Sequence, residues 1–199
     1  MTGGTVCAAV GLAGTGVGIG AFLVLHVLPT GLSPVRDAVS RYGISRYRLG
    51  YRILTVGMGA AGIALAIGVA LAVPAGTSAT GAVAALAVFG VARVVISWFP
   101  MDAPGSERTG HGTAHELIAL VTFAAIATAA FQLRQVTRAI SPGSWAVTAV
   151  GVVAWELLVA VVATFVTLRS PDLRRFFGIA ERLIYLGAFV LLVTVAVAL

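Results

Sequence analysis

Six long apolar runs separated by shorter polar segments make up most of the chain. The runs cover residues 6–28, 49–73, 80–98, 113–133, 145–168 and 179–199. Each has the roughly 20 residues that an α-helix needs to cross a bilayer. Backbone groups cannot bond to water in hydrocarbon, so we expect all six runs to be helices. The pattern predicts an all-α, polytopic membrane protein: one domain, residues 1–199, formed by a bundle of six transmembrane helices without a sizeable soluble domain.

The first run differs from a secretory signal peptide in two ways. No Lys or Arg precedes it, and it is longer than the hydrophobic region of about 7–15 residues that signal peptides carry. We therefore expect it to be retained as the first membrane helix. An even number of spans places both termini on the same side of the membrane.

Composition agrees with a membrane protein. Hydrophobic residues make up 59% of the chain and charged residues only 10%, whereas soluble domains are roughly 25% charged. The single cysteine, Cys7, lies in an apolar run, so the chain offers neither a disulfide framework nor a CxxC redox motif.

The arginines are distributed unevenly between the two ends of the predicted bundle. Loops 1, 3 and 5, with the helix ends beside them, form what we call the arginine-rich end. It carries ten of the 13 basic residues: Arg36, Arg41, Arg46, Arg48, Arg52, Arg108, Arg169, Arg174, Arg175 and Arg182. The opposite end carries only Arg134 and Arg138. The positive-inside rule then predicts a plasma-membrane protein with loops 1, 3 and 5 in the cytoplasm and both termini outside.

The net charge of +6 follows from this basic rim. Basic residues at this depth contact anionic lipid headgroups, so membrane lipids are the expected partners and no nucleic acid is required. Small residues recur at four-residue spacing, as in the pairs Gly14 and Gly18, Gly16 and Gly20, and Gly57 and Ala61. Such spacing lets helix backbones approach closely, either within one bundle or in a homo-oligomer.

Three prolines follow the first, third and fifth runs at equal intervals. Pro29, Pro100 and Pro171 lie 71 residues apart. Equal spacing is compatible with three repeated helix hairpins, and internal repeats are common in transporters. The alternative is that each proline simply follows a helix that has to stop.

The segment between the third and fourth runs is unusually polar. Thr113 and Glu116 fit a capping box, which predicts a helix that begins at Thr113 and leaves His111 outside it. The HExxH zinc motif is absent from the sequence.

All three histidines are predicted at the arginine-rich end. Neutral imidazoles are common ligands of zinc, so His26, His111 and His115 are candidate ligands of a divalent metal such as Zn²⁺. Asp102 and Ser40 are the candidate catalytic residues at the same depth, with Asp37 and Glu181 as possible supporting partners. A second possibility is that His26 and His115 ligate a b-type haem.

Two charged residues lie deep inside apolar runs. Arg93 is in the third run and Glu156 is near the middle of the fifth. A lone charge at that depth costs about 2.5–3.5 kcal/mol on insertion scales, so we expect the two to form an intramembrane charge pair. Alternatively, Glu156 is protonated and Arg93 extends alone to the cytoplasmic edge.

Four short motifs, in this order, resemble the membrane family called domain of unknown function 998. They are "SPVRDAVSRYG", "FPMD", "TGHGTAHE" and "GIAERLIY". The resemblance covers nearly the whole chain and implies a six-helix membrane protein, but it implies no reaction. In residue types alone, the chain is also similar to intramembrane hydrolases of the alkaline ceramidase and adiponectin receptor kind, which use three histidines, an Asp and a Ser.

The sequence thus predicts an integral membrane protein with a polar His/Asp cluster at the cytoplasmic membrane edge, and it does not specify the biochemical activity. Two alternatives remain. One is a metal-dependent intramembrane hydrolase that acts on a lipid. The other is a small transporter or a structural or interaction subunit of the membrane.

Overall fold

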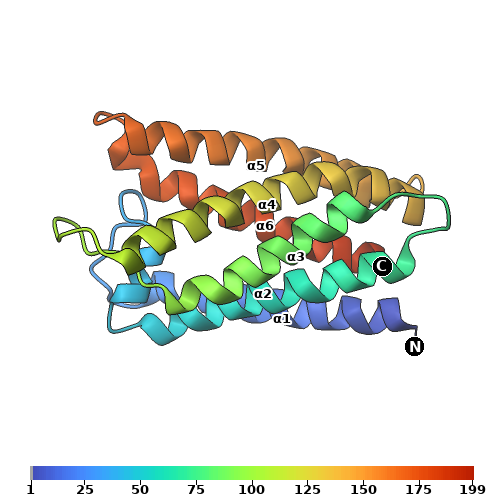
Figure 1. Cartoon of the computed structure of the whole chain (residues 1–199), viewed down its shortest axis with the longest axis horizontal. Helices are drawn as coiled ribbons and strands as arrows, with labels where there is room; N and C mark the ends of the chain where they lie inside the picture. Colours follow the sequence, from blue (N-terminus) through green and yellow to red (C-terminus); the bar gives the residue numbers. More distant parts are fainter. Residues whose placement is uncertain (1) are drawn as a thin grey trace.

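Six long helices run side by side in the computed structural model, which describes residues 2–199 (Figure 1). They are α1 (Gly3–Val27), α2 (Arg48–Ala72), α3 (Thr80–Val95), α4 (Gly110–Ile140), α5 (Trp145–Arg169) and α6 (Phe177–Ala198). Three short 3₁₀ helices lie near their ends: η1 (Val39–Ile44), η2 (Ile96–Trp98) and η3 (Arg174–Phe176). Residues 2–199 contain no strand, and six helical segments are long and apolar enough to cross a membrane. The predicted all-α, polytopic membrane bundle is confirmed.

The helices follow one another around the bundle. Each packs mainly against its neighbour in sequence, and α6 closes the arrangement against α1 while also contacting α2 and α4. Both termini lie at the same end as the α2–α3 and α4–α5 connections (Figure 1). The other end carries loop 1 (28–47), loop 3 (99–109) and loop 5 (170–176), and it is therefore the arginine-rich end.

Helix α4 is longer than the apolar pattern predicts. It runs from Gly110 to Ile140, whereas the apolar run covers only 113–133. The apolar pattern marks the part of a helix in contact with hydrocarbon and not the helix itself. Arg134 and Arg138 therefore lie on the last turns of a continuous helix, where the pattern predicted a loop.

Close approach of backbones holds α2 between α1 and α3. A Cβ atom added at Gly14 would lie 2.7 Å from the carbonyl oxygen of Gly57, and one added at Gly90 would lie 2.8 Å from that of Gly59. Only glycine allows such contact, as the four-residue spacing suggested. Gly16 and Gly20 differ, because no described atom lies within 4 Å of an added Cβ at either position.

Helices α2 and α6 are the most deeply buried spans, whereas α1 and α5 expose most of their surface. Large side chains such as Leu54, Phe89 and Leu192 fill the space between them. Polar side chains on the buried faces of α2 and α6 therefore lie in the centre of the bundle, so the candidate site depends on what those two helices carry.

Candidate polar site at the arginine-rich end

Arg182 of α6 joins three parts of the chain at the arginine-rich end. Its Nε donates to Nε2 of His26 on α1 at 2.7 Å. Its Nη1 donates to the carbonyl oxygen of Asp37 in loop 1 at 2.7 Å and to that of Gly178 at 2.9 Å. This single guanidinium therefore ties loop 1 and the end of α1 to α6.

The contact with Arg182 fixes the tautomer of His26. A guanidinium only donates, so Nε2 of His26 accepts and carries no proton. Nδ1 then carries the proton and donates to the carbonyl oxygen of Phe22 at 2.7 Å. Both ring nitrogens are thus engaged, and His26 has no free lone pair for a metal ion or a haem iron.

Glu181 provides an N-terminal cap for η1 from a distant part of the chain. Its Oε2 accepts from the backbone N–H of Val39 at 2.6 Å. The residue before η1, Ala38, has no side chain that could do this. Glu181 is only 4% exposed, so its carboxylate serves the loop and does not face a ligand.

Arg93 is buried in the bundle, and the described residues provide no carboxylate partner for it. Its Nη1 donates to the hydroxyl of Tyr185 at 3.1 Å, and its Nη2 lies 3.3 Å from the sulfur of Met58. The guanidinium carbon also lies 4.6 Å from the centre of the Tyr185 ring. Cation–π and hydrogen-bond contacts with α2 and α6 therefore replace the expected ion pair.

Glu156 lies elsewhere, between α5 and α6. Its carboxyl packs against Gly187, and neither of its oxygens has a hydrogen-bond partner among the described residues. Among residues 2–199, no ion pair joins Glu156 to Arg93, so the expected charge pair is not formed. The two residues lie at similar depths in the membrane, but their side chains point to different places. Arg93 on α3 points toward α2 and α6, whereas Glu156 on α5 points toward the middle of α6.

Asp102 positions the start of α4. Its carboxylate accepts from the hydroxyl of Thr109 at 2.7 Å and from its backbone N–H at 3.0 Å. These two hydrogen bonds hold the pKa of Asp102 below its usual value, and the bond from the Thr109 hydroxyl has the larger effect. The carboxylate also packs against Gly112, where a Cβ atom would collide with it. Asp102 is therefore engaged in a structural contact, not poised as a free base.

The helix cap is Thr109, so the prediction of a capping box at Thr113 is wrong. The Thr109 hydroxyl accepts from the backbone N–H of Gly112 at 3.0 Å. The hydroxyl of Thr113 instead donates to the Thr109 carbonyl, and Glu116 forms an ion pair with Arg108. Asp102 makes the difference, because its two bonds fix Thr109 in the extended conformation of a cap.

The early start of α4 places His111 inside the helix, against the prediction. His111 is exposed, with its ring 5.8 Å from that of Phe99 between centres. His115 is buried, and its Nδ1 donates to the carbonyl oxygen of Phe99 at 2.7 Å. When the ring is neutral, Nε2 of His115 is therefore unprotonated, and residues 2–199 provide no hydrogen-bond partner for it.

The predicted three-histidine metal site is not formed. No group of three His, Cys, Asp or Glu residues within the part of the chain described here is arranged to hold a metal ion. His26 is bound to Arg182, while His111 and His115 contact Phe99. Sequence reasoning placed all three at one depth, but depth does not fix the direction in which each helix face points.

A small polar cavity does lie at the arginine-rich end, and it contains two of the predicted residues, Ser40 and His115. Its volume is about 110 Å³. Its lining comes from η1, α2, η2 with loop 3, and α4: Ser40, Gly43, Arg48, Tyr51, Arg52, Ile96, Ser97, Pro100, Met101 and His115. We call this cavity the polar pocket.

Two arginines carry the charge of the polar pocket, and neither they nor the neighbouring Tyr51 were assigned to a site from sequence. Arg48 and Arg52 are four residues apart at the start of α2, so they lie on one face of that helix. Tyr51 is buried beside them. The spacing of Arg48 and Arg52 at the membrane edge could have indicated an anion site, but the sequence analysis assigned both arginines only to the basic rim of the bundle.

The contacts of Ser40 do not resemble those of a catalytic nucleophile. Its hydroxyl donates to the sulfur of Met101 at 3.3 Å. No His or carboxylate accepts its proton among the residues described, and Asp102 does not line the pocket. The pocket is thus better suited to bind a charged group than to activate a nucleophile.

The comparisons with known proteins agree with the fold. A family model described as "Protein of unknown function (DUF998)" matches residues 12–198. Comparison with curated proteins found no match, and comparison with solved structures found none either. Because the matched region includes all six membrane-spanning helices except the start of α1, the chain belongs to the DUF998 family.

Proposed function

We propose that this membrane protein binds an anionic group, such as a phosphate, in the polar pocket. The observation that carries the proposal is the charge of the lining. Arg48 and Arg52 supply two guanidinium groups, and no Asp or Glu from residues 2–199 lines the pocket. Guanidinium groups form strong, charge-assisted hydrogen bonds with phosphate oxygens.

The other polar groups of the pocket suit the same ligand. Nε2 of His115 can accept from a protonated phosphate oxygen, or donate to an ionised one when the ring is protonated. The hydroxyl of Ser97 donates to the Val94 carbonyl at 2.8 Å, so its oxygen can accept only from a protonated phosphate oxygen. These groups come from separate helices, so a bound anion would also hold α2, η2 and α4 together.

The size of the pocket limits the ligand. A volume of about 110 Å³ is several times the roughly 30 Å³ share of one water molecule. It is below the roughly 300–1,000 Å³ of pockets that enclose a whole drug-sized molecule. The pocket therefore suits one phosphate-sized group, either free or at the end of a larger molecule.

Phosphate-dependent stability of the purified full-length protein tests this proposal. In detergent and at constant ionic strength, replacing chloride with inorganic phosphate should raise the melting temperature of the wild type. The double variant Arg48→Ala/Arg52→Ala should lose that increase. Arg36→Ala is the matched control, because Arg36 is an exposed arginine at the same end that does not line the pocket. An equal increase in the double variant would overturn the proposal.

We further infer that the arginine-rich end faces the cytoplasm and that both termini lie outside the plasma membrane. The support is the ten-to-two distribution of arginines between the two ends. Ser78, in the connection between α2 and α3, and Ser106 of loop 3 are both exposed. In a Cys7→Ala background, an impermeant thiol reagent added to intact cells should label Ser78→Cys and not Ser106→Cys. The reverse pattern would invert the orientation.

A further inference from the structure

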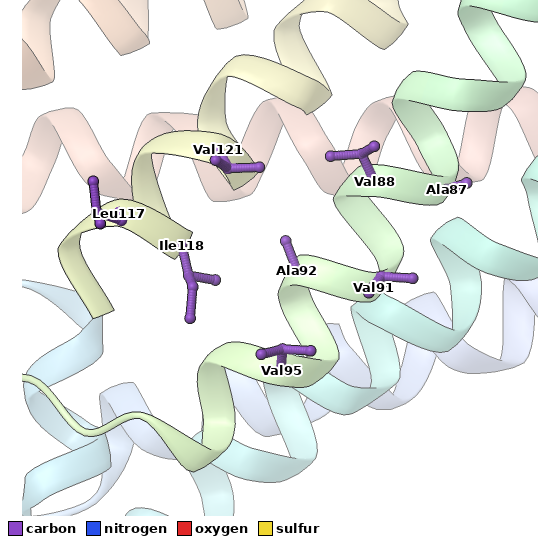
Figure 2. Close-up of a pocket in the computed structure, with 8 residues that line it drawn as sticks. All are labelled: Ala87, Val88, Val91, Ala92, Val95, Leu117, Ile118 and Val121. Atoms are coloured by element: carbon purple, nitrogen blue, oxygen red, sulfur yellow. The ribbon is translucent and has the colours of Figure 1, made fainter. Parts of the chain in front are cut away.

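A second cavity, entirely apolar, lies between α3 and α4. Its volume is about 510 Å³. Figure 2 shows its two walls, with α4 residues on one side and α3 residues on the other. The lining consists of Ala87, Val88, Val91, Ala92, Val95, Leu117, Ile118 and Val121. We call it the α3–α4 groove.

The α3–α4 groove opens toward the surroundings of the bundle and not toward its core. Val91 is 52% exposed and Leu117 is 60% exposed. In a membrane these side chains face the acyl chains of lipids, because both belong to helices that span the bilayer. The groove is therefore a recess in the lipid-facing surface of the protein.

Residues that line the groove are followed or preceded closely in sequence by residues that line the polar pocket. Val95 lines the groove, and the next two residues, Ile96 and Ser97, line the pocket. On α4, His115 of the pocket lies three residues before Ile118 of the groove, which is about one helical turn on the same face. The two cavities therefore use successive residues of the α3–η2 segment and of α4, with the polar cavity nearer the arginine-rich end.

This order of polar and apolar surface matches one class of molecule. A soluble anion would use the pocket and leave the groove unexplained, and a partner helix would fill the groove without using the pocket. A lipid has its charged headgroup at the membrane edge and its acyl chain deeper. The basic lining of the pocket selects for an anionic headgroup.

We propose that the polar pocket and the α3–α4 groove form one site for an anionic lipid of the cytoplasmic leaflet. The headgroup phosphate lies between Arg48 and Arg52, and one acyl chain lies in the groove against Ala92. This inference rests on the proposed function, because it identifies the lipid headgroup as the source of the anion.

The two parts of the site contribute differently. Lipid chains are as apolar as the groove, so moving a chain from bilayer to groove gains little hydrophobic free energy. The preference for one lipid over another therefore comes from the headgroup, while the groove sets the position of the chain. Removing the arginines should weaken the selectivity for the headgroup, whereas filling the groove should exclude every lipid chain.

Trp98 provides a local probe, because it lies at the end of η2, three residues after Val95 of the groove, and is 56% exposed. The experiment uses the full chain with Trp145→Phe and Trp155→Phe, so that only Trp98 fluoresces. The protein is placed in phosphatidylcholine vesicles that contain a minor fraction of phosphatidylglycerol. Bromine atoms, which quench tryptophan, are carried on the acyl chains of one lipid at a time.

Brominated phosphatidylglycerol should quench Trp98 more than its share of the lipid mixture accounts for. The variant Arg48→Ala/Arg52→Ala should weaken this preference about tenfold, the effect expected from losing a charge-assisted hydrogen bond. Ala92→Phe and Val121→Phe should both remove the excess quenching by filling the groove. Val159→Phe adds the same bulk on the exposed face of α5 and should leave the preference unchanged.

The outcomes separate this inference from the function on which it rests. If inorganic phosphate stabilises the protein but Trp98 shows no preference for phosphatidylglycerol, the lipid inference fails and the anion pocket stands. If phosphate has no effect and the preference is absent, both fail. If both groove variants retain the wild-type preference, the acyl chain does not lie between α3 and α4 and the combined site is overturned.

Discussion

Helix α6 has two neighbouring regions that differ in whether the buried polar groups there have hydrogen-bond partners. In its first half, Glu181, Arg182 and Tyr185 each make a hydrogen bond to another segment. Less than one turn beyond Tyr185, Gly187 packs against the carboxyl of Glu156, for which the described residues offer no hydrogen-bond partner. The two regions lie on the same buried helix and differ in what surrounds them.

Distance from the end of the bundle explains most of the difference. Near the arginine-rich end, loop 1 and η1 supply free backbone N–H and C=O groups, and α6 side chains bond to them. In the middle of a span every backbone group is already bonded within its own helix. A polar side chain there needs another side chain as its partner, and Glu156 has none in residues 2–199.

The largest loss of stability is expected from removing the hydrogen bond between Glu181 and Val39 in the first region. Glu181→Ala leaves the buried N–H of Val39 without an acceptor and η1 without its cap. The free energy of unfolding should fall by about 1–3 kcal/mol, measured by denaturant unfolding of the purified protein in detergent. Glu181→Gln keeps an acceptor oxygen and should lose less.

The exposed acid Glu107, at the same end, provides the control. Glu107→Ala should leave the stability within about 0.5 kcal/mol of the wild type. If Glu181→Ala behaves like Glu107→Ala, the α6 contact does not stabilise loop 1, and the contrast between the two regions disappears.

A similar or slightly smaller loss of stability is expected from adding a side chain at Gly187 in the second region. In Gly187→Ala, the new Cβ atom would collide with the Glu156 carboxyl and lie 2.9 Å from Cγ of Leu157. Overpacking of this kind costs about 1–3 kcal/mol, measurable in the same unfolding assay. Adding Glu156→Ala should restore part of the loss, while the contact with Leu157 keeps the rest.

Gly20→Ala is the matched control for Gly187→Ala. No described atom lies within 4 Å of a Cβ at Gly20, and alanine favours the helix more than glycine does. Stability should therefore be unchanged or slightly higher. Equal losses in the two glycine variants would show that helix α6 does not approach α5 closely at Gly187.

The smallest effect is expected from Glu156→Gln. An ionised carboxylate without a partner is costly in hydrocarbon, so we expect Glu156 to be protonated and close in shape and charge to glutamine. The variant should change the free energy of unfolding by less than about 1 kcal/mol. Stabilisation by about 2 kcal/mol or more would show that the wild type carries an unpaired charge at this position.

The fold could be predicted from sequence because the bilayer leaves few choices. Long apolar runs must become helices, and the structure places all six where the runs lie. Helix ends were harder, since the true cap at Thr109 depends on Asp102, seven residues earlier. Nothing in the spacing of Thr113 and Glu116 reveals that contact.

For the candidate site, the sequence predicted only how deep each residue lies in the membrane. The depth of His26, His115 and Arg93 follows from their positions in the apolar runs, but their directions do not. In helices that are apolar all round, no amphipathic pattern shows which face is buried. His26 consequently turned out to contact Arg182, and Arg93 to contact Tyr185. The four-residue spacing of Arg48 and Arg52 can be read from the sequence, but only the structure shows that both line a cavity.

The position of α6 as the sixth helix has a consequence for biogenesis. As the chain is synthesised, α1 to α5 enter the membrane and pair with their sequence neighbours before α6 is made. Until then, η1 lacks the cap supplied by Glu181, His26 lacks Arg182, and Arg93 lacks Tyr185. These polar groups of loop 1, α1 and α3 therefore gain their partners only when α6 docks, which makes this docking the step that completes the polar contacts of the bundle.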